Sequence, residues 1–243
     1  MSKLFFNAGS KMCFCMVAAV LFAPLLFSAC SNPQSGGTFT DPRDGKTYRT
    51  VRIGNLTWMA QNLNYQTNNS WCYGNDVSNC EKYGRLYTWD AAMSACPAGW
   101  RLPDNNDWND LTKSAGGQRE ELDDGGAYWS SVGKKLKSKT GWSDFFCDEE
   151  LKVALNRELG EDCVLDKMNN GNGTDNFGFS ALPGGTRSTN GSFYFAGSDG
   201  LWWSATEYGS GYAYRRLMGS NYGYVYEYYY GKGYGFSALC VQD

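Results

Sequence analysis

Residues 96–103 read Cys-Pro-Ala-Gly-Trp-Arg-Leu-Pro, a stretch with a proline near each end and a tryptophan inside. A helix is predicted just before it, because Thr88 can cap residues 89–95 and Pro97 cannot continue them. The stretch is therefore expected to be a tight connection that leaves one helix and enters another.

A second helix is predicted directly after Pro103. Asp104 can cap it, and Asp107 three places on can complete a capping box. Three residues recur on one face at helical spacing: Trp108, Leu111 and Thr112. The pair Gly116-Gly117 is expected to end the helix.

Outside these helices the composition favours short strands and tight turns. Aromatic residues make up 16% of the chain, beside 30 glycines. A hairpin is predicted where a Gly54-Asn55 turn separates two runs of apolar residues: Tyr48, Val51 and Ile53, then Leu56, Trp58 and Met59. Residues 64–80 are interpreted as an Asn-rich loop, 127–142 as a short amphipathic piece with a lysine face, and 177–243 as strands and turns.

Residues 1–29 are predicted to be a lipoprotein signal peptide. Lys3 and Lys11 precede an uncharged apolar run over 13–27, which is short for a bilayer span and contains a proline. Small residues then stand directly before Cys30, as in a bacterial lipobox, so Cys30 is the expected lipidation site. Residues 30–38 are a predicted flexible tether. The alternative is an ordinary secretory signal that leaves Cys30 as a thiol.

The remaining cysteines point to disulfides. Six stay after processing, and an even number in an exported chain favours bridges, although several pairings remain open. They are Cys72, Cys80, Cys96, Cys147, Cys163 and Cys240. Zinc is a poor alternative, because the spacings lack CxxC and the chain has no histidine.

The absence of histidine also removes Ser-His-Asp and Cys-His catalysis. No run of Lys or Arg marks a nucleic-acid surface, and the formal charge is −3. Residues 143–170 form a predicted acidic insertion, in which Leu151, Leu155 and Leu159 share a helical stripe. A solvated surface flap is the favoured interpretation of this segment.

The strongest functional signal is a stripe of alternating tyrosines. In an extended strand these five share one face: Tyr222, Tyr224, Tyr226, Tyr228 and Tyr230. Tyr and Trp offer a flat apolar face and a polar tip, which suits stacking on sugar rings or anchoring a protein. The alternative is that tyrosine simply favours strands and packs inward. Trp202 and Trp203 should point to opposite faces of their strand.

In their order along the chain, several motifs resemble the Fibrobacter succinogenes major paralogous domain family. They are residues 96–103 with Trp108, the segments 136–142, 173–185 and 202–207, and the closing 235–241. The resemblance covers about residues 39–243, which are taken as one domain. It implies exported, often lipid-anchored proteins. Because Ser31 rather than Asp follows Cys30, the bacterial outer membrane or cell surface is the expected location, with only a lipid in the membrane.

That family is in turn similar to the formylglycine-generating enzyme group and to C-type-lectin-like domains. The resemblance implies an α+β fold: two helices beside a small antiparallel sheet with long loops, stapled by disulfides. It also implies the bridge Cys96–Cys240, and proximity then pairs Cys72 with Cys80 and Cys147 with Cys163. The oxidase activity of the enzyme group needs two copper-binding cysteines near the C-terminus, which this chain lacks.

Calcium chemistry has two weak indications. The string Trp108-Asn109-Asp110 is found in sugar-binding C-type lectins, but here it falls inside a predicted helix and is treated as a coincidence. The segment 169–176 has oxygen ligands, yet tight-turn chemistry around Asp175 explains it better. No metal site and no cofactor are assigned, with calcium left open.

The sequence thus predicts a lipid-anchored binding module that recognises polysaccharide by Tyr and Trp stacking. The expected site combines Trp202, Trp203 and the tyrosine stripe with three polar residues: Arg187, Glu207 and Asn221. Alternatives are a protein-interaction or structural surface module, or an enzyme of unknown chemistry on a formylglycine-generating-enzyme-like scaffold. Glycosidase chemistry would need an acid pair, for which Glu207, Glu227 and Asp175 are the candidates. An enzyme is the less favoured interpretation.

Overall fold

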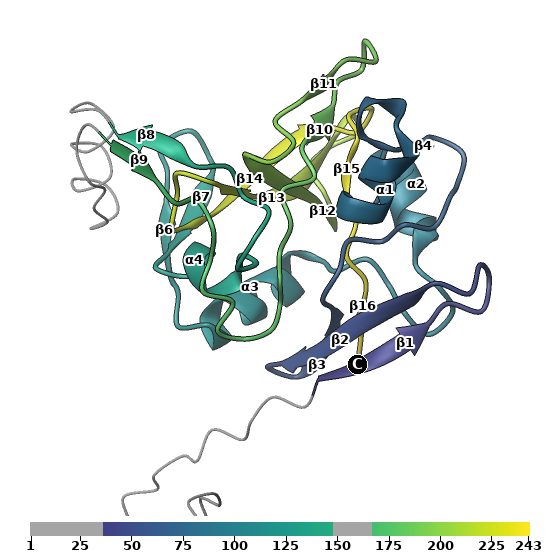
Figure 1. Cartoon of the computed structure of the whole chain (residues 1–243), viewed down its shortest axis with the longest axis horizontal. Coiled ribbons are helices and arrows are strands. Elements are labelled where there is room, and N and C mark those ends of the chain that lie inside the picture. Colours follow the sequence, from purple (N-terminus) through teal and green to yellow (C-terminus); the bar gives the residue numbers. More distant parts are fainter. Residues whose placement is uncertain (1–35, 148–166) are drawn as a thin grey trace, which may run out of the picture. The chain divides into compact units, whose positions relative to one another are not determined.

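The computed structural model describes residues 36–147 and 167–243, a mixed α+β structure with more strand than helix (Figure 1). The helices are η1 (Tyr73–Asn75), α1 (Val77–Tyr83), α2 (Trp89–Ala95), α3 (Asn105–Ser114) and α4 (Gly133–Leu136). The strands are β1 (Gly36–Thr40), β2 (Thr47–Ile53), β3 (Leu56–Met59), β4 (Ser70–Trp71), β5 (Leu86–Tyr87), β6 (Gln118–Glu121), β7 (Ala127–Ser130), β8 (Phe145–Cys147), β9 (Lys167–Asn169), β10 (Thr186–Arg187), β11 (Phe193–Tyr194), β12 (Asp199–Glu207), β13 (Tyr212–Gly219), β14 (Val225–Gly231), β15 (Phe236–Ser237) and β16 (Val241–Gln242).

The largest element is an eight-stranded sheet in the order β4-β5-β15-β12-β13-β14-β7-β6. Its neighbouring strands run antiparallel except β12 and β15, which pair in parallel at Trp202 and Ser237. The long central strands β12, β13 and β14 come from the aromatic C-terminal third of the chain, as β-propensity leads one to expect. The sheet predicted from sequence was small, and the observed one is much larger.

A separate four-stranded sheet in the order β1-β2-β3-β16 contains both the first and the last described strands (Figure 1). The predicted hairpin is confirmed, with β2 and β3 joined at Gly54-Asn55. Gly54 has φ +63°, a left-handed conformation that costs glycine little. The chain therefore closes on its own beginning through β16.

The two predicted helices are confirmed with their caps. Thr88 accepts a hydrogen bond from the Ala91 backbone N–H, and Asp104 forms the full capping box with Asp107 at the start of α3. Two further α-helices, α1 and α4, were not predicted as helices; α1 occupies the end of the supposed loop 64–80. Of the predicted amphipathic piece 127–142, the first residues form β7 and only α4 is helical.

The core between α3 and the sheets is built from large aromatic rings. The Trp108 ring packs against three others, with centroid distances of 5.2 Å to Trp58, 6.3 Å to Phe179 and 6.4 Å to Trp202. All four of these side chains are fully buried. Such tilted and edge-on pairs add to the free energy of burial, so Trp108 ties α3 to both sheets.

Two of the three predicted disulfides are confirmed. Cys72–Cys80 closes a local loop, whereas Cys96–Cys240 joins the end of α2 to the residue before β16. The third, Cys147–Cys163, involves a residue outside the described part of the chain. What is described of the predicted insertion is its base, where β8 and β9 pair antiparallel; the helical stripe lies outside the described residues.

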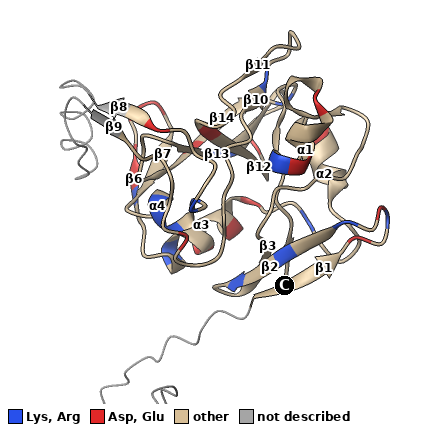
Figure 2. Cartoon of the chain, in the orientation of Figure 1, with Lys and Arg blue, Asp and Glu red and all other residues tan. Residues whose placement is uncertain are grey.

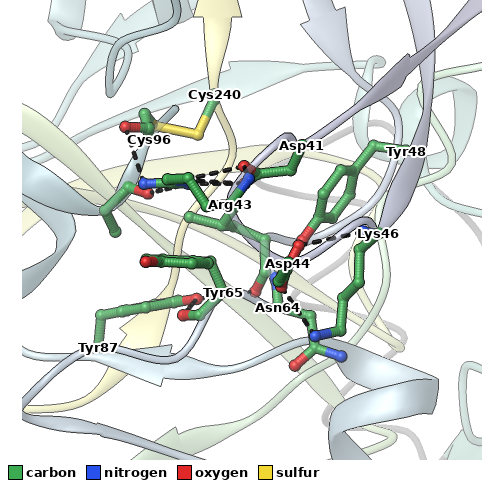
Figure 3. A network of polar contacts seen from close by, with 12 residues as sticks. Asp41, Arg43, Asp44, Lys46, Tyr48, Asn64, Tyr65, Tyr87, Cys96 and Cys240 are labelled. Atoms are coloured by element: carbon green, nitrogen blue, oxygen red, sulfur yellow. Dashed lines mark hydrogen bonds and ion pairs between the residues drawn. A yellow bond between two sulfur atoms is a disulfide. The ribbon is translucent and has the colours of Figure 1, made fainter. Parts of the chain in front are cut away.

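Arg43 links the turn of the first hairpin, formed by β1 and β2, to the backbone beside the long disulfide (Figure 3). Asp41 is fully buried and accepts from Arg43 at 2.9 Å (Nε to Oδ1) and 2.7 Å (Nη2 to Oδ2). Arg43 also donates to the Ala95 carbonyl at 2.8 Å and lies 3.7 Å from the Tyr65 ring centroid. The hydrogen bonds from Arg43 lower the pKa of Asp41.

Among the described residues, no helix has the length and apolar character needed to cross a bilayer.

Removing each disulfide should have unequal effects on stability. The bridged cysteines are 144 residues apart in Cys96–Cys240 and 8 apart in Cys72–Cys80. Loop-closure entropy then predicts losses of about 5 and about 2.5 kcal/mol for the two double Cys→Ser variants. Urea unfolding of both variants beside the parent measures the difference. Equal losses would contradict this account of the long bridge.

Candidate functional site

The tyrosine stripe lies along β14 and lines one face of the central sheet. Tyr226, Tyr228 and Tyr230 are partly exposed, while Val225 and Glu227, which alternate with them, are buried. Tyr222 and Tyr224 precede the strand, with ring centroids 4.8 Å apart. Within β14 the predicted shared face holds for Tyr226 and Tyr230, whose rings both lie beside Arg215, whereas the Tyr228 ring stacks on that of Tyr229.

Two hollows open on this face and meet at its centre. Both are lined by Asp199, Arg215 and Leu217. The hollow toward the β10–β11 hairpin, about 340 Å³, adds Tyr194, Phe195, Tyr230, Tyr234 and Phe236; we call it the hairpin-side hollow. The other, about 400 Å³, adds Tyr128, Tyr222, Tyr224 and Tyr226 and is called the tyrosine-side hollow. Together they form the aromatic groove.

Arg215 lies at the junction of the two hollows. The residue is 8% exposed, and its Nε and Nη1 atoms are buried without a hydrogen-bond partner among the described residues. Its guanidinium carbon lies 5.7 Å from the Tyr226 ring centroid and 5.6 Å from that of Tyr230. Burial lowers the pKa of Arg215 to about 10, so it stays charged at neutral pH. A buried guanidinium with unused donors is costly unless a partner arrives.

Asp199 supplies the acceptor of the groove. It begins β12, held by a turn in which the Phe195 carbonyl accepts from the backbone N–H groups of Ser198 and Asp199. Burial raises the pKa of Asp199 to about 6, against a smaller opposing effect of the Arg215 charge. No ion pair joins Asp199 to Arg215 in the described structure, so donor and acceptor face the same groove without satisfying each other.

Two consecutive arginines on β13, Arg215 and Arg216, show which face of the sheet carries the groove. Side chains alternate along a strand, so Arg215 and Arg216 point to opposite faces. Arg216 faces α3, where it pairs with Glu227 at 2.7 Å and donates to the side-chain oxygens of Asn105 and Asn109. Its neighbour Arg215 has no such set of partners. Sequence reasoning did not identify Arg215 as a site residue. The available signal was the two consecutive arginines, Arg215 and Arg216, inside an otherwise uncharged strand.

The turn before the tyrosine-side hollow is held by a buried lysine. Lys137 Nζ donates to the backbone carbonyls of Gly219, Ser220 and Tyr222 at 2.9, 3.3 and 3.1 Å. Lys137 was predicted to belong to the lysine face of an amphipathic piece, but it is fully buried. Three charge-assisted bonds fix the turn, so Tyr222 and Tyr224 enter the groove from a rigid base.

The two predicted tryptophans do not belong to the accessible surface. They point to opposite faces of β12 as expected, but both are fully buried. Trp202 donates to the Asn62 side chain at 2.7 Å, and Trp203 donates to the Tyr87 carbonyl at 2.8 Å and packs on Phe236. The reason is that β12 is central in the sheet and covered on both sides. Neither indole therefore offers a face to a ligand.

The other predicted polar residues lie outside the groove lining. Arg187 stacks on Trp71 at 3.9 Å, and Glu207 pairs with Lys232. Asn221 lies in the turn that Lys137 holds, and Tyr228 stacks on Tyr229 with centroids 4.5 Å apart. Of the site residues predicted from the sequence, the groove lining contains four: Tyr222, Tyr224, Tyr226 and Tyr230.

The three acids considered for catalysis are each engaged elsewhere. Glu227 pairs with Arg216 and Arg119, Glu207 with Lys232, and both Asp175 oxygens accept from Ser180. The Asp175 bonds, at 2.8 and 2.6 Å, are those of a tight turn. Asn109 of the Trp-Asn-Asp string lies in α3 and binds Arg216. Across residues 36–147 and 167–243, no group of three or more Cys, Asp or Glu could hold a metal ion.

Charged residues are interspersed along the ribbon (Figure 2). Near the tyrosine-side hollow, Glu120 accepts a hydrogen bond from the Tyr128 hydroxyl at 2.6 Å. Burial raises the pKa of Tyr226, and the negative charge of Asp124 raises it further. The nearby base Arg119 is held by Glu121 and Glu227. The rim of the groove at this end is therefore acidic.

Comparison with known proteins gives one positive finding. A family model described as the Fibrobacter succinogenes major domain matches residues 51–242. The searches of curated proteins and of solved structures return no match. The matched range contains α2, α3, the whole central sheet and every residue of the aromatic groove.

The raised pKa of Asp199 predicts a pH-dependent effect of Asp199→Asn on stability. The folded state binds this proton more tightly than the unfolded state, so Asp199 destabilises the fold increasingly as pH rises from about 4 to about 6. The variant should be more stable than the parent by about 1–3 kcal/mol at pH 8 and about equal at pH 4. Urea unfolding at both pH values tests this. A stability difference between variant and parent that is the same at pH 4 and pH 8 would contradict it.

Proposed function

The chain belongs to the Fibrobacter succinogenes major domain family, and we propose that this member is a saccharide-binding module whose site is the aromatic groove. The observation that carries the proposal is Arg215, a buried guanidinium with unused donors between aromatic rings. Stacking alone would suit many ligands, whereas stacking beside a donor and an acceptor that are not bonded to each other suits few.

A sugar ring has the matching chemistry. Its apolar faces can stack on tyrosine rings, while its edge presents hydroxyls that both donate and accept hydrogen bonds. Asp199 can accept from one hydroxyl and Arg215 can donate to the next. Binding would thus satisfy the Arg215 donors that the free protein leaves without a partner.

The proposal includes a place at the bacterial cell surface. Processing at Cys30 with lipid attachment would tether the domain to the outer membrane by a lipid alone, through residues 30–38. The signal-like residues 1–29 and the confirmed disulfides, which form in oxidising compartments, support this. Polysaccharide outside the cell would then be the accessible ligand.

The finer fold assignment is also part of the proposal. We relate the domain to formylglycine-generating-enzyme-like and C-type-lectin-like folds. Support comes from helices α2 and α3 beside an antiparallel sheet, and from a disulfide between the end of α2 and the C-terminal segment. The eight-stranded sheet is larger than this resemblance implied.

A protein partner is the second candidate, favoured by a different surface. On the sheet face opposite the groove, Tyr208 and Tyr229 stack with centroids 3.8 Å apart, beside exposed Tyr212. Exposed tyrosines of this kind are common anchors in protein interfaces. This surface shares no residue with the groove lining.

Affinity electrophoresis can test the saccharide proposal. The purified protein is run through gels containing cellulose derivatives, xylan, mannan or pectin, with and without calcium. We expect retardation in at least one gel, lost in Tyr224→Ala/Tyr226→Ala and in Arg215→Met. The Met variant keeps the apolar stem of a residue whose charge is unpaired, so the fold should persist.

Tyr212→Ala is the matched control, because it removes an exposed tyrosine from the opposite face of the same sheet. It should be retarded as strongly as the parent. Absence of retardation in every gel would end the saccharide proposal and direct attention to a protein partner.

A further inference from the structure

The two hollows lie on either side of Arg215, which lines both of them. Arg215 pairs across the strands with Tyr228, so Tyr226 and Tyr230 lie two residues to either side. Tyr226 lines the tyrosine-side hollow and Tyr230 the hairpin-side hollow. Four strand residues span about 13 Å, which is longer than one sugar ring. A ligand filling both hollows must therefore cross Arg215.

The hairpin-side hollow has an aromatic residue in a strained conformation at its mouth. Phe195 has φ +68° and is 57% exposed. A bulky residue rarely adopts positive φ, and its exposed ring gains little from burial. The same turn holds Asp199 through the Phe195 carbonyl. Phe195 thus supplies an accessible ring where the groove receives its ligand.

The charges of the groove favour a ligand without net charge. Arg215 and Asp199 balance each other at neutral pH, and Glu120 and Asp124 add negative charge at the tyrosine-side rim. A polyanion would meet these acids along its length. Neutral hydroxyls instead satisfy Arg215 as donor and Asp199 as acceptor together.

From this arrangement we infer that the groove binds the interior of a neutral polysaccharide chain, with one sugar at Arg215 and Asp199 and its neighbours stacked in the two hollows. The inference rests on the proposed saccharide-binding function. It adds the number of sugar positions, the bound part of the chain and the charge class of the ligand.

Calorimetric titration with oligosaccharide ladders tests the inference. Cello-, xylo- and manno-oligosaccharides from disaccharide to hexasaccharide are compared, with polygalacturonate as the anionic probe. For the ladder that binds, affinity should rise by about tenfold from disaccharide to tetrasaccharide, since a further aromatic contact adds about 1 kcal/mol. Reduction of the terminal sugar of the hexasaccharide should leave its affinity unchanged.

Two variants separate the hollows. Tyr224→Ala acts on the tyrosine-side hollow, and Phe195→Gly removes a ring from the hairpin-side hollow while relieving positive φ, so the fold is retained. Each should weaken the hexasaccharide by about tenfold and leave the disaccharide within about threefold. Tyr212→Ala should change neither.

The outcomes distinguish the two proposals. If a neutral sugar binds but affinity stops rising at the disaccharide, or if Phe195→Gly has no effect, the mid-chain arrangement is wrong and saccharide binding stands. Stronger binding of polygalacturonate than of every neutral ladder would overturn the neutral ligand class. If neither the ladders nor any polysaccharide in the gels binds, both proposals fail.

Discussion

The buried ion pair between Arg216 and Glu227 fixes the relation of helix to sheet. The two residues face each other across β13 and β14, and Arg216 continues to Asn105 and Asn109 on α3. Breaking a pair of this kind leaves an uncompensated charge in the core, which costs far more than a surface contact. The pairing of β13 with β14 is consequently fixed so that Arg216 points toward α3. The next residue, Arg215, must then face the other side.

This alternation explains why the groove contains a charge at all. A strand that carries Arg216 into the core could have carried an apolar residue at 215, as it does at Ala213 and Leu217 on the same face. Arg215 instead lies between Tyr226 and Tyr230 with donors unused. Buried polar groups in native proteins almost always have partners. An exception framed by aromatic rings is most simply understood as half of an interaction that a ligand completes.

Local signals in the sequence were sufficient for two helix starts and one turn. The capping residues Thr88 and Asp104 and the Gly54-Asn55 turn act on neighbours in the chain, and those elements were predicted correctly. The fate of Trp202 and Trp203 depends on Asn62, Tyr87 and Phe236, which are far away in sequence. The alternation of side chains along a strand predicted that the two indoles point to opposite faces of β12. It could not show that both faces are covered by other parts of the fold. For the same reason the tyrosine stripe was found, whereas Arg215 and Asp199, which need the fold to meet, were not.

The first hairpin has a mechanical consequence when load enters the domain at its N-terminal end. Gly36 pairs with Val51 at the open end of β1 and β2, so a pull there would separate the rungs one after another. Peeling would stop at Asp41, where Arg43 transmits the force to the Ala95 carbonyl. Beside that point Cys96 is covalently bonded to Cys240. The domain thus combines an outer strand that can peel with a turn anchored by hydrogen bonds, beside the covalent link between α2 and the C-terminal segment.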